Sequence, residues 1–148
     1  MKTRSLLAVL AATSIVGCTH PAETMQVEFM PVARPGAVFS PAVRVGNILF
    51  LSGQIGTDTA SKLVAGGIQL EARQALNNIR TTVEKYGSSM DKVVKCTVFL
   101  ADIRDYNDFN EIYASYFHAH KPARSAMAAS GLALGARVEI ECIAVVDT

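Results

Sequence analysis

The 148-residue chain is predicted to fold as an α+β domain, a mixed β-sheet with two helices on one face. Strand-like runs occur in pairs at both ends of the chain, and two amphipathic stripes flank a single strand-like run between them. The expected order of elements is therefore ββ-α-β-α-ββ. Half of the residues are hydrophobic and 18% are charged, a composition that allows a sizeable core and argues against global disorder.

The N-terminal strands are predicted from β-branched runs bounded by turn residues. Residues 27–30 are expected to add a first strand ahead of the ββ-α-β-α-ββ elements. Residues 43–45 and 48–52 are expected to form the two arms of a hairpin, because the intervening Gly46-Asn47 pair tolerates positive φ. The glycine-containing segment 53–58 is expected to be a loop.

The two helices are predicted from apolar residues that recur every three or four positions. The first runs from Ile68 to Tyr86, with Gly87 as its C-cap, and the second spans about 106–118. Asp102 or Asp105 is expected to cap the start of the second helix. Three further strands complete the sheet, at residues 93–100, about 125–130 and 137–146.

Two carboxylates on the last predicted strand carry the clearest functional signal. Glu139 and Glu141 lie on one face of this strand, because side chains alternate along it, and such charges in an apolar strand are costly without a partner or a task. Upstream, Arg124 follows a proline and can hold a carboxylate in two parallel hydrogen bonds. A carboxylate can handle the protons of an attacking water. The pattern predicts a site for a small organic acid, with a structural ion pair at a subunit contact as an equally weighted alternative.

The strand face that carries the carboxylates also carries Ile143 and Val145, whereas Ile140, Cys142 and Ala144 point to the other side. A sheet face that is partly apolar and partly charged is typical of an oligomer interface with a site at its edge. The sequence therefore predicts that the uncovered face of the sheet meets other copies of the chain.

The N-terminal segment has the features of a bacterial lipoprotein signal. Lys2 and Arg4 precede the short apolar run 6–16, and Ile15-Val16-Gly17-Cys18 resembles a lipobox. Residues 1–17 are therefore expected to be a signal peptide, residues 18–26 a polar tether and residues 27–148 the folded domain. Lipid on Cys18 would anchor the protein to a membrane of the cell envelope, on the periplasmic side. The alternatives are an ordinary signal peptide, or a true start at Met25 and a cytoplasmic protein.

The charge and the cysteine pattern bear on nucleic-acid binding, metal binding and disulfide formation. Without residues 1–17 the chain has 12 basic and 13 acidic residues, scattered along it, so binding to nucleic acid is not expected. The sequence has no zinc-binding pattern, and no metal site is expected. Cys96 and Cys142 both lie in strand-like runs. Buried reduced thiols are the favoured expectation for this pair, because free cysteine packs well in apolar cores, and a disulfide is the alternative.

Six sequence elements resemble, in their order along the chain, those of the Rid (RidA/YjgF) proteins. They are Ser52-Gly53-Gln54-Ile55, Ala72-Arg73-Gln74-Ala75-Leu76-Asn77-Asn78-Ile79, Val94-Lys95-Cys96-Thr97-Val98-Phe99-Leu100, Asn110-Glu111-Ile112-Tyr113, Pro122-Ala123-Arg124-Ser125 and Val138-Glu139-Ile140-Glu141. The resemblance covers about residues 27–146. Its most specific part is the Pro-Ala-Arg-Ser element with the strand carboxylates that follow it.

This resemblance implies a chorismate-mutase-like α+β sandwich and a homotrimer with clefts between subunits. It also implies hydrolysis of reactive 2-imino and enamino acids to 2-oxo acids and ammonia, as by a 2-iminobutanoate/2-iminopropanoate deaminase, without metal or organic cofactor. By the same resemblance, Arg124 matches the arginine that grips the substrate carboxylate, and Glu139 matches the carboxylate that positions water. Ser52 and Gly53 match the cleft segment that helps to hold the substrate.

The chain departs from the deaminase-type pattern at two positions. Those members have a tyrosine in a Gly-Pro-Tyr stretch, and the matching residues here are Ser40-Pro41-Ala42, which places Ala42 at the tyrosine position. Two residues after the arginine, Ala126 replaces a frequent cysteine. A second function therefore stays open, a non-catalytic binding or sensing module for small carboxylates in the cell envelope. The RNA cleavage known for some relatives is disfavoured by the near-neutral charge.

Overall fold

The computed structural model describes residues 24–32 and 35–147 of the chain. Cys18 and the predicted signal peptide lie outside the described residues, as does most of the predicted tether. The described elements are the strands β1 (Val27–Phe29), β2 (Ala42–Val45), β3 (Ile48–Leu51), β4 (Gln54–Ile55), β5 (Val93–Leu100), β6 (Ala123–Ala128) and β7 (Val138–Val145), and the helices α1 (Ile68–Lys85) and α2 (Tyr106–Ala114). Three short 3₁₀ turns connect some of them.

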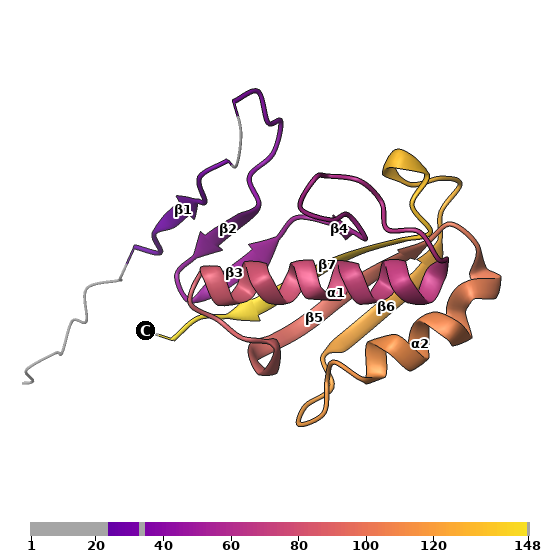
Figure 1. The fold of residues 1–148 in the computed structure, drawn as a ribbon. Helices are drawn as coiled ribbons and strands as arrows, with labels where there is room; N and C mark the ends of the chain where they lie inside the picture. The colour runs from indigo at the N-terminus through magenta and orange to yellow at the C-terminus, as the bar shows by residue number, and fades with distance from the viewer. Residues whose placement is uncertain (1–23, 33–34, 148) are drawn as a thin grey trace, which may run out of the picture.

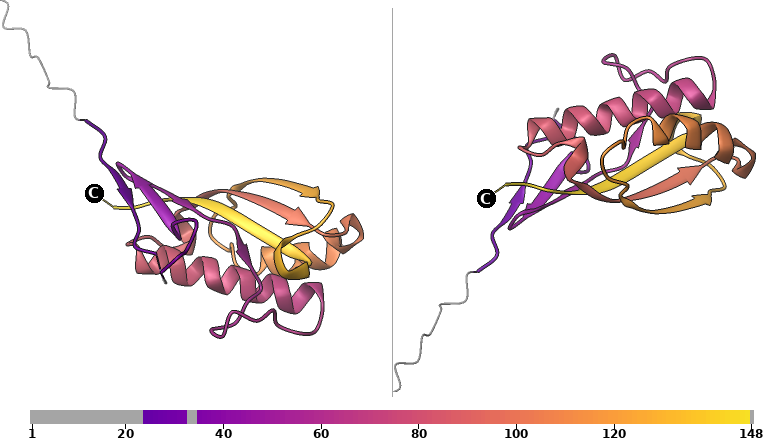
Figure 2. Two further views of the ribbon diagram at one scale, coloured as in Figure 1. Left: turned by 90° about the horizontal axis from the view of Figure 1, so that it is seen from above. Right: turned by 90° about the horizontal axis from the view of Figure 1, so that it is seen from below.

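The strands form one mixed sheet with the order β1-β2-β3-β7-β5-β6, and β4 also pairs with β7. Only β5 and β6 run parallel among the described pairs, and the other pairs are antiparallel. Both α-helices pack on the same face, and none of the described helices lies over the opposite face of the sheet (Figures 1 and 2). The predicted two-layer α+β arrangement is therefore confirmed. Within the described residues, no helix is both long and apolar enough to cross a membrane.

The N-terminal hairpin forms where the sequence predicted it. Val45 pairs with Ile48 across a two-residue turn, and Gly46 at the first turn position has φ 59°, which glycine adopts without the steric cost of a Cβ. The first strand, β1, pairs with β2 and extends the sheet at this edge.

Helix α1 follows the predicted apolar stripe closely. Its buried residues include Ala72, Leu76, Ile79 and Val83, spaced at three and four positions, so one face packs on the sheet. Gly87, just past the helix end, has φ 82°, as expected for a glycine that terminates a helix.

Helix α2 is shorter than predicted, since its α-helical part ends at Ala114. Phe117, beyond that end, is nevertheless buried in the core. The expected caps differ as well: the carboxylate of Asp102 accepts from the backbone N–H of Arg104 at the start of a 3₁₀ turn. Asp105 makes no capping bond, because both of its carboxylate oxygens bind the Arg137 side chain.

The last two strands are consecutive in the chain but are not neighbours in the sheet. β7 inserts between β3 and β5 in the middle of the sheet, whereas β6 lies outside β5 at the edge. The reason is the connection through α2, which returns the chain in the same direction and so places β6 parallel to β5, with Arg124 beside Cys96. β7 then has the central position and receives hydrogen bonds from both sides.

The segment 53–55, predicted as part of a loop, contains the short strand β4. Phe50 pairs with Ile143, and Gln54 pairs with Ile140. The chain from β3 to β4 therefore spans four residue steps between these two pairs, whereas β7 spans only three. The extra residue is a β-bulge, a feature that bends a strand and is frequent beside functional sites. It places Gly53 beside β7.

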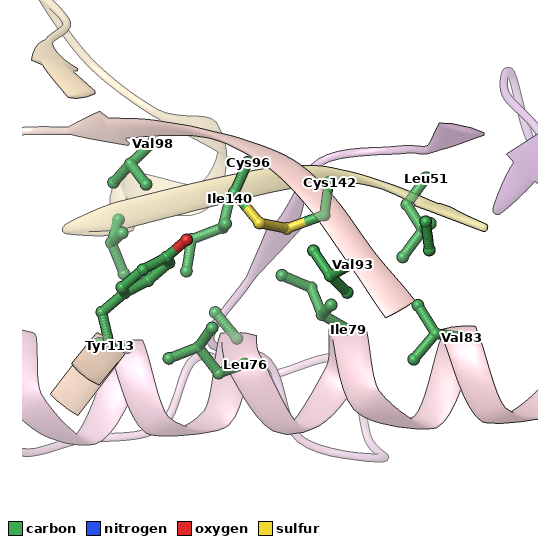
Figure 3. Packing of buried hydrophobic residues seen from close by; sticks show 14 of the residues in the cluster. Leu51, Leu76, Ile79, Val83, Val93, Cys96, Val98, Tyr113, Ile140 and Cys142 are labelled. Carbon is green, nitrogen blue, oxygen red and sulfur yellow. A yellow bond between two sulfur atoms is a disulfide. The ribbon is translucent and has the colours of Figure 1, made fainter. Parts of the chain in front are cut away.

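The core between sheet and helices contains a disulfide in place of the two free thiols that were favoured. Cys96 and Cys142 face each other in the β5–β7 register, with a Cα–Cα distance of 4.1 Å, and their sulfur atoms are bonded. Both residues are buried against α1, near Ile79 (Figure 3). The favoured expectation failed because it rested on the apolar neighbours of each cysteine, whereas the register across two distant strands decides whether the thiols meet.

Candidate active site

Arg124, the predicted anion-binding residue, lies on the helix-covered face of the sheet. Its strand neighbour Cys96 points into the core, and Arg124 points the same way, towards α2. The guanidinium carbon is 4.6 Å from the ring centre of Tyr113, 5.6 Å from that of Tyr106 and 5.8 Å from that of Phe109. Aromatic faces attract cations at such distances, so three rings of α2 hold the guanidinium in place.

The guanidinium of Arg124 has most of its hydrogen-bonding capacity available. Nη2 donates to the hydroxyl oxygen of Tyr106 at 3.1 Å, and no carboxylate of the described residues forms an ion pair with this arginine. A guanidinium has five N–H donors, so four remain for a ligand. A half-buried cation on an aromatic support, with its planar fork free, is suited to a carboxylate. Within the described part of the single chain, Arg124 and the strand carboxylates form no ion pair. The structural pair considered from the sequence would join two chains, and it stays a prediction.

Tyr113 forms the base of this aromatic support. Burial raises the pKa of its phenol to about 12, although the positive charge of Arg124 acts in the opposite direction. Tyr113 therefore stays neutral near pH 7, and its hydroxyl oxygen is buried without a hydrogen-bond partner in the described structure. The arginine thus rests on a neutral ring and keeps its positive charge for a ligand.

Glu139 lies on the opposite, uncovered face of the sheet. Its neighbour Ile140 is fully buried under the helices, whereas Glu139 is partly exposed and Glu141 is exposed. Both carboxylates therefore remain in contact with solvent in the single chain, which removes the desolvation cost that the sequence pattern suggested.

The carboxylate of Glu139 lies directly against Gly53. A methyl group added at Gly53 would come within 2.0 Å of Glu139 Oε1, so only glycine allows the carboxylate to rest in this position. The bulge after β3 brings Gly53 there, and the Asn78 side chain of α1 holds the next turn by donating to the carbonyl oxygens of Ile55 and Thr57. Glu139 and Gly53 therefore form one corner of the candidate site.

Ser52 belongs to the same corner and is already hydrogen-bonded. Its hydroxyl donates to the carbonyl oxygen of Ser40 at 2.7 Å, and its backbone N–H donates to that of Pro41. The hydroxyl oxygen of Ser52 can therefore still accept a hydrogen bond, but its proton is engaged. These contacts tie the segment before β2 to the end of β3.

The two halves of the predicted site do not meet within one chain. Glu139 pairs with Phe99, and Phe99 pairs with Met127, so two strand spacings and three residues of β6 separate Glu139 from Arg124. At usual strand dimensions this is roughly 10 Å across the sheet and roughly 10 Å along it, and the side chains point to opposite faces. One small substrate cannot contact both residues of the same chain.

The structure corrects the position assigned to the missing tyrosine. Ala42 is 1% exposed and pairs with the buried Leu51, so its side chain points into the core. A phenol at this position would enter the core and could not line a cleft. Phe39, three residues earlier, is 64% exposed and is the aromatic residue of this segment that is available to a partner or a ligand.

The sequence did not point to the aromatic support of Arg124. Phe109 and Tyr113 lie on the apolar face of α2, where the sequence pattern alone indicates core residues, and both are buried. Their contact with the arginine follows from the parallel pairing of β5 and β6, which the local sequence does not encode. The described residues contain no cluster of three or more His, Cys, Asp or Glu side chains suited to a metal ion.

Comparison with known proteins identifies the family. Residues 30–146 match the family model described as Endoribonuclease L-PSP. The chain belongs to this family, the Rid (YjgF) family that its motifs resemble. It is 48% identical to yeast (Saccharomyces cerevisiae) Protein HMF1 over 108 residues, which cover 73% of this chain and 84% of the yeast protein.

Two further relatives carry functional information in their names. The human 2-iminobutanoate/2-iminopropanoate deaminase is 46% identical over 114 residues, 75% of this chain and 83% of the human protein. The crystal structure of E. coli TdcF with bound serine superimposes with a TM-score of 0.72 at 31% identity, covering 81% of this chain and 99% of that one. This Rid-family chain thus has the chorismate-mutase-like fold of its relatives, and close relatives of it are imine deaminases.

Proposed function

We propose that this Rid-family protein hydrolyses 2-imino acids, and the enamino acids in equilibrium with them, to 2-oxo acids and ammonia. The observation that carries the proposal is the Arg124 guanidinium, which rests on three aromatic rings, has no anionic partner among the described residues and keeps four N–H donors for a carboxylate. The names of its mammalian relatives support the same reaction.

In the proposed mechanism, Arg124 binds the substrate carboxylate and thereby fixes the position of the adjacent C=N carbon. Glu139 accepts a proton from a water molecule as the water oxygen bonds to this carbon. Glu139 passes this proton to the nitrogen, which becomes an amine on the carbon that now bears a hydroxyl. The hydroxyl proton then moves to the nitrogen, the C–N bond breaks as the C=O bond of the 2-oxo acid forms, and ammonia leaves. The reaction consumes one water and needs no redox partner, and we propose that it proceeds without cofactor.

We further propose that the site is completed by a second copy of the chain in a homotrimer. Arg124 and Glu139 lie on opposite sheet faces in one chain, and the uncovered face bears exposed apolar residues, among them Phe50 (43% exposed) and Ile48 (38% exposed). Packing of this face on a neighbour would bury these side chains and bring Glu139 of one chain towards Arg124 of the next.

Mixing two inactive variants tests the shared site. Arg124→Lys and Glu139→Gln each lack one half, and in randomly assembled trimers roughly a quarter of the sites would combine both intact halves. Unfolding and refolding the two variants together should therefore restore activity that neither has separately. An inactive mixture that contains trimers of both variants would contradict the shared site, and a monomer in light scattering would contradict the trimer.

The activity itself is tested by generating imines in place. An amino-acid oxidase with several amino acids as substrates supplies 2-imino acids, and their disappearance is followed with and without the domain 27–148. Acceleration by the domain supports the hydrolase. If 2-oxo acids bind but imine loss stays at the background rate, the second candidate holds, a binding or sensing module for small carboxylates.

We propose that the protein is exported and lipid-anchored through Cys18. The disulfide between Cys96 and Cys142 supports export, because such bonds persist in the periplasm and are rare in the reducing cytoplasm. Cys18→Ser should release the protein from membranes. A variant that still sediments with membranes in high salt would contradict the anchor, and recovery of the native protein in the cytoplasmic fraction would favour a start at Met25.

A further inference from the structure

The Tyr106 hydroxyl is the one hydrogen-bond partner of the Arg124 side chain among the described residues. Tyr106 is the first residue of α2 and is half-buried. Its oxygen accepts from Nη2 at 3.1 Å, and its ring centre lies 5.6 Å from the guanidinium carbon. The contact is therefore both polar and aromatic, unlike those of Phe109 and Tyr113.

The three rings and the hydroxyl act on the guanidinium in different ways. A ring face attracts a cation with little preference for rotation about the axis between them, so Phe109 and Tyr113 fix where the charge lies but not how the fork is turned. A hydrogen bond is directional. By occupying one N–H of Nη2, the Tyr106 oxygen fixes the rotation of the guanidinium plane.

We propose that Tyr106 is a positioning residue for carboxylate recognition, which holds the Arg124 fork in the one setting that meets a planar carboxylate with two parallel hydrogen bonds. This inference rests on the proposed function of Arg124 as the carboxylate anchor. Its consequence is specificity: the site favours a carboxylate over an amide or ester of the same size, because only a correctly turned fork gains the second hydrogen bond.

The test is Tyr106→Phe, which keeps the ring and removes the oxygen. Binding of 2-oxobutanoate is measured by NMR titration, which also reports weak affinities, and turnover by the oxidase-coupled assay. Tyr106→Phe should raise Kd and KM about tenfold, the usual effect of one hydrogen bond to a charged group, with kcat unchanged within about twofold. The amide of 2-oxobutanoate should bind both proteins alike.

Tyr116→Phe is the matched control. The Tyr116 hydroxyl donates to the carbonyl oxygen of Arg73 and to Asn77 Oδ1 on α1, and its ring supports a different arginine, Arg80. The Tyr116→Phe substitution therefore removes a phenol oxygen from a tyrosine that also packs against a guanidinium. This control variant should have the same Kd, KM and kcat as the wild-type protein.

A double-mutant cycle separates positioning from a general structural effect. In an Arg124→Lys background there is no fork to orient, so Tyr106→Phe should change Kd by less than about twofold. Equal losses from Tyr106→Phe in the wild-type and Arg124→Lys backgrounds would overturn the inference, as would wild-type affinity in Tyr106→Phe. A wild-type protein that binds no 2-oxo acid would instead overturn the proposed function, and this inference with it.

Discussion

The two faces of the sheet hold their functional side chains in different ways. On the helix-covered face, Arg124 is supported by three rings and one hydroxyl of α2. On the uncovered face, Glu139 is partly exposed and rests against the backbone of Gly53. The surroundings of Arg124, the proposed anion anchor, are thus formed within one chain. Glu139, the proposed acid–base group, has one close backbone contact in the chain, and the rest of its surroundings depend on what packs on the open face.

This difference separates binding from chemistry in the proposed reaction. In this proposal a single chain carries a preformed grip for a carboxylate, and the rings around Arg124 belong to the core or pack against it. In the proposed trimer, the environment of Glu139 is completed only when a neighbouring chain covers the open face. Substitutions on the two faces should therefore fail in different ways, the first by losing the ligand and the second by losing turnover.

The largest effect is expected for Arg124→Lys. Lysine keeps the charge but loses the planar fork, so both parallel hydrogen bonds to the carboxylate are weakened, and kcat/KM should fall by a factor on the order of 10² to 10³. Arg80→Lys is the control, because Arg80 also lies over a tyrosine ring, at 4.8 Å, but on α1. Unchanged 2-oxo acid affinity in Arg124→Lys would show that this arginine is not the anchor.

On the open face, Glu139→Gln should lower kcat by a factor on the order of 10², the usual contribution of a positioned acid–base group, while 2-oxo acid binding persists. Glu141→Gln, two residues along the same strand face, is the control and should have little effect. The two variants are compared by imine turnover and by titration. Full turnover in Glu139→Gln combined with a loss in Glu141→Gln would move the role to Glu141.

Gly53 and Gly56 differ in what an added methyl group would meet. An alanine Cβ at Gly53 meets the end of the flexible Glu139 side chain, so Gly53→Ala should displace the carboxylate, lower turnover about tenfold and leave the thermal midpoint nearly unchanged. At Gly56 the same methyl meets the backbone of Glu71 at 2.6 Å, and Gly56→Ala should destabilise the fold by about 1–3 kcal/mol. Calorimetry and the turnover assay measure both. If Gly53→Ala lost stability but kept normal turnover, the proposed role of Gly53 in positioning the Glu139 carboxylate would be contradicted.

The smallest effect on turnover is expected for the disulfide. Removing it with Cys96→Ala and Cys142→Ala together should lower the free energy of unfolding by about 4 kcal/mol, from the 46-residue separation of the bonded cysteines. Turnover of the folded protein at 25 °C should change by less than about twofold, because the bond lies in the core. Denaturant titration without reductant measures the loss. Equal free energies of unfolding for the wild-type protein and the double variant would contradict the bond. So would the detection of two reactive thiols in wild-type protein unfolded without reductant.

Much of the fold could be read from local patterns. The hairpin at Gly46, the helix from Ile68 and the alternation along β7 all follow from periods of 3.6 and 2 and from turn chemistry, which depend only on neighbouring residues. The motif around Arg124 and Glu139 predicted the family for the same reason, since its residues stand in a fixed order along the chain.

The arrangement of the site was decided by tertiary structure. The insertion of β7 between β3 and β5 brings Cys142 opposite Cys96, and the parallel pairing of β6 turns Arg124 towards α2. The bulge before β4 brings Gly53 against Glu139, and the burial of Ala42 removes it from any cleft. Except for the burial of Ala42 in the β2–β3 hairpin, each of these arrangements joins strands that are distant in the sequence. A shift of one residue in their register would reverse which face each side chain meets. Local periodicity specifies two faces of a strand, whereas the order and register of the strands determine what each face contacts.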